Sequence, residues 1–152
     1  LHGRLSLAEA GHTIIDWTTG ATLESLGSGT ALARAAGEDA AAVAARASEG
    51  DPDALRCFTV AAEALAVGVF NLVHCFSPEV VVIGGGMSQA GELLLGPIRA
   101  RLQRCGSNCP ASRAQVVKAE GGDDVGLRGG LAYWMDCREA MHVSGDREQG
   151  GM

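Results

Sequence analysis

The segment VVVIGGGMS, residues 80–88, constrains the fold of this chain more than any other, because four β-branched residues stand directly before three glycines. A run of this kind is typical of a strand buried on both faces of a sheet. Consecutive glycines let the backbone turn sharply and approach another group closely. We therefore expect a strand, a tight turn and then a helix, with either protein or a ligand lying against the turn.

Hydrophobic periodicity on both sides of this segment predicts helices. The clearest helix lies within residues 51–79, where apolar side chains recur at alternating spacings of three and four. Asp51 can cap its start, Pro52 suits its first turn, and Pro78, with the restricted Ser77 before it, ends it. The apolar stripe consists of Leu55, Phe58, Ala62, Leu65, Val69, Leu72 and Phe76.

Further helices and a strand complete the predicted order. Two Ala-rich helices precede the long helix, the first with Ser28 as its N-cap and Gly37 as its stop. A helix, a short strand and another helix follow the glycines. In chain order these segments are 28–37, 38–50, 90–105, 114–120 and 123–137. Helices alternating with strands imply an α/β fold with right-handed crossovers and a mostly parallel sheet.

The predicted strands are too few for the predicted helices. Two good strands and a possible edge strand at residues 13–16 cannot cover the apolar faces of five helices. The chain also begins with Leu rather than Met, and residues 138–152 lose hydrophobic periodicity and gain Gly and charge. We therefore expect the chain to be part of a larger protein, with residues 138–152 as a flexible tail.

Composition argues against several kinds of partner. The 152 residues carry a net charge of −6 and no basic block, which disfavours nucleic acid as a partner of this segment. The five cysteines are an odd number, and there is no signal peptide and no apolar run of membrane-spanning length. These features predict a single cytoplasmic domain without a membrane partner.

A polar constellation lies near the start of the chain. Glu9 stands three residues before His12 in EAGH, and Glu24 lies just ahead of the helix at 28–37. Two carboxylates and an imidazole could hold several vicinal hydroxyls of a sugar ring at once. Solvated surface groups are the alternative, because the spacing alone does not distinguish the two.

The three glycines also leave two alternatives open. A turn at the carboxyl end of a strand offers backbone N–H groups to an anion or a flat ring. Close packing of the next helix would need small residues as well. Residues 84–91 do not meet the dinucleotide fingerprint G-x-G-x-x-G, which disfavours a Rossmann dehydrogenase.

Four segments, in chain order EAGH, TLESLGSGTALARAAG, NLVHCFSPEVVVIGGGMSQAGELLLGPIRARL and GGDDVGLRGGLAY, resemble the C-terminal half of the ROK family of bacterial sugar kinases and sugar-responsive repressors. The resemblance covers about residues 3–136. It implies a partial actin-like ATPase (ribonuclease H-like) domain over residues 1–137. It also implies a cytoplasmic, homodimeric protein that phosphorylates a hexose with ATP and Mg²⁺.

The resemblance further assigns roles to residues. Glu9 and His12 match the family's sugar-binding E-x-G-H motif, and Glu24 matches the sugar-binding Glu of its C-L-E motif. The family's I-G-G-G loop lies against the adenosine of the nucleotide, which implies a ligand beside the glycine turn. The residues that match this loop are Gly84, Gly85 and Gly86.

The chain departs from the family's pattern in two ways. Many members place C-x-C-G-x-x-G-C-x-E after the His and hold a structural zinc there, but the interval from His12 to Glu24 contains no cysteine. We therefore predict that zinc is absent, since Cys105 and Cys109 alone cannot close a tetrahedral site. Neither the phosphate-binding D-x-G-x-T turn nor the Asn-Asp pair that carries the catalytic base occurs here. We predict that the chain contains no catalytic residue and is inactive alone.

Two function classes stay open for the whole protein. An ATP-dependent hexose kinase is favoured. A sugar-responsive repressor would keep the same sugar pocket and add a helix-turn-helix, and only then would DNA be a partner. A remnant without activity is the third alternative. The coding sequence upstream of Leu1 would separate the kinase from the repressor.

Overall fold

The computed structural model describes residues 9–120, 124 and 126–135. The chain divides into two compact units, Leu1–Lys118 and Ala119–Met152. Residues 126–135 of the second unit are helical, which confirms the described part of the predicted final helix. The predicted flexible tail, 138–152, and the first residues of the chain lie outside the described residues.

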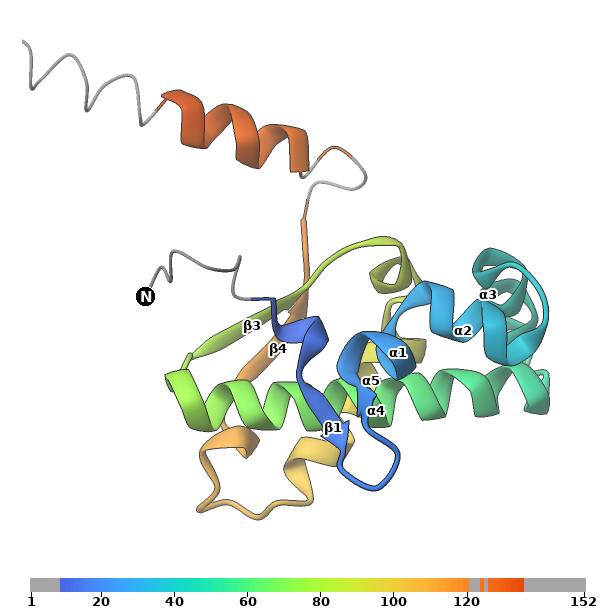
Figure 1. Ribbon diagram of the computed structural model, residues 1–152, viewed down its shortest axis with the longest axis horizontal. Helices are drawn as coiled ribbons and strands as arrows, with labels where there is room; N and C mark the ends of the chain where they lie inside the picture. The colour runs from blue at the N-terminus through green and yellow to red at the C-terminus, as the bar shows by residue number, and fades with distance from the viewer. Residues whose placement is uncertain (1–8, 121–123, 125, 136–152) are drawn as a thin grey trace, which may run out of the picture. The chain divides into compact units, whose positions relative to one another are not determined.

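Helix α4 (Pro52–Phe76) is the long green helix of Figure 1 and forms the centre of the core. Asp51 caps it by accepting hydrogen bonds from the backbone N–H groups of Asp53 and Ala54, with Pro52 at its first turn as predicted. The helix ends at Ser77, which adopts a left-handed φ of 50° before Pro78. Local sequence therefore determined both ends of this helix.

The predicted apolar stripe of α4 is mostly confirmed. Phe58, Ala62 and Val69 are buried, whereas Phe76 at the end of the helix is 66% exposed. The buried face is wider than predicted, because small residues beside the stripe let neighbouring helices come close. At Gly68, an added Cβ would lie 2.5 Å from Cδ2 of Leu23. Gly68 therefore sets how closely helix α1 (Leu23–Gly27) packs on α4.

The expectation that no apolar run reaches membrane-spanning length is wrong for α4. Its 25 residues, with a mean hydropathy of 1.6 in the most apolar window, are long and apolar enough to cross a membrane by length and composition. The central helix of a soluble core passes the same test, and α4 buries nine of its residues against helices of this unit. The packing therefore accounts for the apolar character of α4.

The predicted parallel strands are present. β3 (Val80–Ile83) pairs in parallel with β4 (Gln115–Lys118), and helix α5 (Glu92–Gln103) forms the crossover between them. Burial alternates along β3, so Val80 and Val82 are 46% and 58% exposed. The expectation that this strand is buried on both faces is therefore wrong for the described residues, in which only one face is covered.

The predicted edge strand at residues 13–16 is not part of the parallel sheet. β1 (Ile14–Asp16) pairs antiparallel with β2 (Ala21–Thr22) as a separate hairpin and does not join β3. The Asp16 carboxylate explains the reversal, because it accepts hydrogen bonds from the Thr18 N–H and the hydroxyls of Thr18 and Thr19. The chain therefore folds back within a few residues.

Two further short helices follow α1 along the chain. α2 (Gly29–Ala36) begins at Ser28, whose hydroxyl accepts from the Ala31 N–H, and ends at Gly37 with a left-handed φ of 72°, as predicted. α3 (Ala40–Ser48) lies next along the chain (Figure 1). Short 3₁₀ turns complete the unit: η1 (Ala10–His12), η2 (Gly86–Ala90) and η3 (Pro110–Ser112).

Candidate functional site

The first two candidate sugar-binding residues form a pair. Glu9 is the residue directly before the η1 turn and His12 is its last residue, so the two side chains can meet across a single turn. Glu9 Oε2 lies 2.8 Å from His12 Nε2. Both side chains are more than half exposed, at 54% and 67%, which leaves them open to an incoming polar ligand.

Glu24 lies beside this pair. It occupies the first turn of α1, and the Leu23 N–H donates to the Thr13 carbonyl over 2.9 Å, which fixes α1 against η1. An added Cβ at Gly11 would lie 3.4 Å from Cβ of Glu24 and 3.8 Å from its Oε2. These are ordinary van der Waals distances, so Glu24 lies directly against the turn at Gly11. The structure thus brings the three predicted residues into one exposed polar group, although they are separated by the hairpin in sequence.

The hairpin between His12 and Glu24 replaces the cysteine-rich interval of many family members. Hydrogen bonds from the Thr18 and Thr19 hydroxyls and the Thr18 N–H lower the pKa of Asp16 to about 2, so its carboxylate is ionised at neutral pH. Among the described residues, no group of three or more His, Cys, Asp or Glu side chains could share a metal ion. The absence of zinc stays a prediction.

One contact between two polar side chains was not predicted from the sequence. Nε2 of His74, at the end of α4, lies 3.9 Å from Sγ of Cys109, and its Nδ1 lies 2.8 Å from the Phe70 carbonyl. The two residues are 35 positions apart, so no local sequence pattern relates the end of α4 to the loop before η3. Two side chains do not make a metal site.

The glycine turn is open on one side. Gly84, Gly85 and Gly86 are exposed, and an added Cβ at Gly85 or Gly86 would meet nothing within 4 Å. Gly85 has a φ of 80° and a ψ of 178°, a conformation essentially reserved for glycine. Below the turn, the buried Ser88 hydroxyl donates to the Gly85 carbonyl over 2.7 Å. Close helix packing therefore does not explain Gly86.

A cleft of about 760 Å³ borders this turn. One wall comes from α2 and α3, through residues such as Leu32 and Ala44, and the other from η2 and α5, through Gly86, Met87 and Leu93. Apolar walls of this kind suit a flat ring. The family resemblance implied a ligand beside Gly86, but the wall formed by α2 and α3 was not predicted from the sequence. The Ala-rich composition of α3 was the signal, because small side chains leave room for a ligand.

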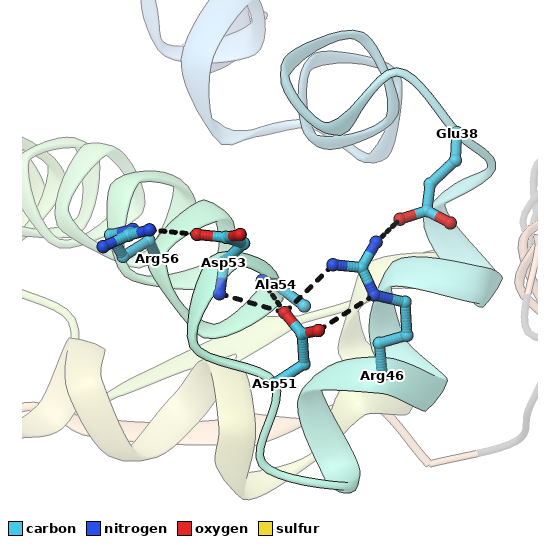
Figure 2. Close-up of polar contacts among 6 residues, drawn as sticks. All are labelled: Glu38, Arg46, Asp51, Asp53, Ala54 and Arg56. Atoms are coloured by element: carbon cyan, nitrogen blue, oxygen red, sulfur yellow. Dashed lines mark hydrogen bonds and ion pairs between the residues drawn. The ribbon is translucent and has the colours of Figure 1, made fainter.

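An ion-pair network holds α3 in place (Figure 2). Arg46, near the end of α3, donates through Nη2 and Nε to the Asp51 carboxylate over 2.9 and 3.3 Å, and its Nη1 contacts Glu38. The hydrogen bond from Arg46, then that from the Ala54 backbone, lowers the pKa of Asp51. The network joins the start of α4 to both ends of α3, so it fixes one wall of the cleft.

Comparison with known families identifies the family of the chain. The sequence profile of the ROK family matches residues 2–137. The chain belongs to the ROK family. A glucokinase of Thermotoga maritima is 46% identical over 56 residues, which are 37% of this chain and 18% of that protein.

Two solved ROK structures share the fold. The ROK glucokinase of Streptomyces griseus, in complex with glucose and AMPPNP, has a TM-score of 0.62 and 30% identity over 70% of this chain and 42% of its own. The ROK hexokinase of Thermus thermophilus has a TM-score of 0.69 and 27% identity over 91% of this chain and 51% of its own. The predicted actin-like ATPase fold is confirmed. The chain spans about half the length of these proteins or less.

Proposed function

We propose that this chain is the nucleotide- and sugar-binding C-terminal half of an ATP-dependent hexose kinase, formed by residues 1–137. One observation carries the proposal. The helix that bears Glu24 is joined through Ser28 alone to the helix whose Gly29 and Thr30 line the cleft beside Gly86. A polar group suited to sugar hydroxyls and an apolar cleft suited to adenine therefore lie on consecutive helices.

In this proposal Glu9, His12 and Glu24 hold the hydroxyls of the hexose, and the turn formed by Gly84, Gly85 and Gly86 receives the adenosine of ATP. Mg²⁺ keeps several waters and binds substrate phosphates readily. The described residues offer no cluster of carboxylates for it. Mg²⁺ would therefore reach the site on the nucleotide.

The relatives favour a kinase over a sugar-responsive repressor, because they are glucokinases and a hexokinase. Glucose or a close hexose is the proposed substrate, since the Streptomyces griseus enzyme was solved with glucose. A homodimer in the cytoplasm stays an expectation for the whole protein.

Calorimetric titration with adenosine and ATP tests the nucleotide site. The wild-type chain should bind both, and Gly86→Val should lower both affinities by about tenfold or more, because its side chain would enter the cleft. Folding should survive, since Gly86 has open space and no left-handed φ. Ala100→Val, on an exposed position of α5, is the matched control. Wild-type affinity in folded Gly86→Val, or a wild-type chain that binds neither compound, would overturn the proposal.

A further inference from the structure

Lys118 is the only lysine of the 152 residues, and it is the last residue of β4. It pairs in register with Ile83, the residue directly before Gly84. The parallel pairing therefore places this cation at the carboxyl edge of the sheet, beside the glycine turn. In open α/β sheets ligands bind at this edge.

A hydrogen bond connects Lys118 to the cleft. Its Nζ donates to Oε1 of Gln89 over 2.8 Å. Gln89 belongs to η2 and lines the same cleft as Gly86. The contact spans 29 positions in sequence, so tertiary folding brings the amine to the cleft wall.

The partner of Lys118 leaves its charge available. Arg46, Arg99 and Arg101 each donate to a carboxylate, whereas Lys118 donates to a neutral amide. An amide oxygen holds the ammonium group without neutralising it. Among the residues that the structure describes, the hydrogen bond to Gln89 therefore leaves the ammonium group of Lys118 open to an anion at this edge.

The cleft itself supplies no such charge. Among the described residues that line it, Asp39 alone is charged, and its carboxylate is engaged in capping α3 through the Ala41 N–H. A carboxylate repels phosphate, and the chain carries a net charge of −6. The apolar cleft can therefore receive the base of a nucleotide but needs a cation outside it for the phosphates.

We propose that Lys118 binds the phosphate groups of the nucleotide whose adenosine occupies the cleft. The ammonium group leaves or shares Gln89 when phosphate arrives, because a hydrogen bond between ammonium and phosphate joins two opposite charges, whereas the amide of Gln89 is neutral. This inference rests on the proposed function. It goes beyond it by naming the residue that distinguishes ATP from adenosine.

The first test compares adenosine, AMP, ADP and ATP by calorimetry with the wild-type chain, Lys118→Gln, Lys118→Arg and the control Arg104→Gln. Arg104 is an exposed cation paired with Glu63 on α4. We expect Lys118→Gln to lower ATP affinity about tenfold and adenosine affinity less than about twofold. Lys118→Arg should retain most of the ATP affinity, and Arg104→Gln should behave like the wild type.

The outcomes separate this inference from the proposed function. A wild-type chain that binds neither adenosine nor ATP would overturn both. Wild-type binding of both compounds, with the same ATP-to-adenosine affinity ratio in Lys118→Gln, would overturn the role of Lys118 and leave the nucleotide site standing.

The single lysine permits a second test without substitution. A sulfonated N-hydroxysuccinimide acetate acylates amines: the nitrogen attacks the ester carbonyl, N-hydroxysuccinimide leaves, and the amine loses a proton to water. The N-terminal amine serves as the internal reference in mass spectrometry. Saturating ATP should slow acetylation of Lys118 several-fold, and saturating adenosine should not. Equal rates with ATP and with adenosine would contradict the proposal.

Discussion

Gly85 and Gly86 are neighbours, yet they are glycine for different reasons. At Gly85 the backbone itself requires glycine, because φ is 80° and ψ is 178°. A side chain there would strain the turn whether or not a ligand binds. At Gly86 the backbone makes no such demand and the space is open. Only Gly86 can therefore report on a ligand without disturbing the fold, which is why it carries the test above.

The sugar-binding group makes a prediction at the same scale. Glu24→Gln keeps the shape of the side chain but removes its negative charge and one acceptor, so it leaves a sugar hydroxyl poorly paired. We expect glucose affinity to fall by about tenfold, with adenosine affinity unchanged. Calorimetry with both ligands measures this, and Glu79→Gln, an exposed carboxylate before β3, is the control. If glucose binds Glu24→Gln as it binds the wild type, Glu24 is not in the sugar site.

The family resemblance predicted the sugar-binding residues, but the sequence could not show which of them lie close together. Glu9 and His12 match one short motif, and the structure places them at the two ends of a single turn. Glu24 joins them through Gly11, whose role depends on a contact across the hairpin. Lys118 and the pair of His74 with Cys109 depend on contacts 29 and 35 positions apart. Such contacts leave no local pattern.

At the scale of elements, the structure follows the sequence wherever an element is determined locally. The caps at Ser28 and Asp51 and the stop at Gly37 lie where the sequence placed them, because each cap satisfies backbone groups of its own helix. The strand β1 was predicted, but its pairing at the edge of the parallel sheet was predicted wrongly. Pairing depends on which strand lies nearby, and the turn at Asp16 brings β2 beside β1. The exposed face of β3 was not predicted for a similar reason. Its apolar composition indicates that both faces favour burial, but it does not show which residues, if any, cover them.

The network around Arg46 makes a prediction about α3. Arg46→Gln removes the guanidinium that joins Glu38 to Asp51, so α3 should move more freely at the cleft (Figure 2). We expect adenosine affinity to fall about threefold and glucose affinity to stay unchanged. Arg46→Lys should recover only part of the loss, because an ammonium group cannot make the paired contact to Asp51.

Arg56→Gln is the matched control for this network. Arg56 pairs with Asp53 within α4, is well exposed and does not touch α3. It removes the same charge and should leave both affinities unchanged. Equal losses in Arg46→Gln and Arg56→Gln would show that net charge, and not the position of α3, controls nucleotide binding.

At the scale of the whole molecule, the proposed sites would bind both substrates, but the two motifs that hold and transfer phosphate in the resembled family do not occur in this chain. Neither D-x-G-x-T nor an Asn-Asp pair occurs in the 152 residues. Phosphoryl transfer depends on holding the phosphates in line with the acceptor and on a group that orients or deprotonates the acceptor hydroxyl. Binding and catalysis should therefore separate in this chain, even though its relatives are named as kinases.

We expect the chain to bind adenosine and glucose by calorimetry and to release no ADP from ATP above the rate without protein, whether glucose is present or absent. A coupled assay for ADP measures the release, and Thermotoga maritima glucokinase serves as the positive control. Lys118 supplies one charge near the phosphates, but a single cation offers neither alignment nor a base. Glucose-dependent ADP release that disappears in Glu24→Gln would show that these residues alone suffice for transfer. In that case a catalytic base would have to be sought among the carboxylates beside the sugar group, with Glu9 as the first to replace.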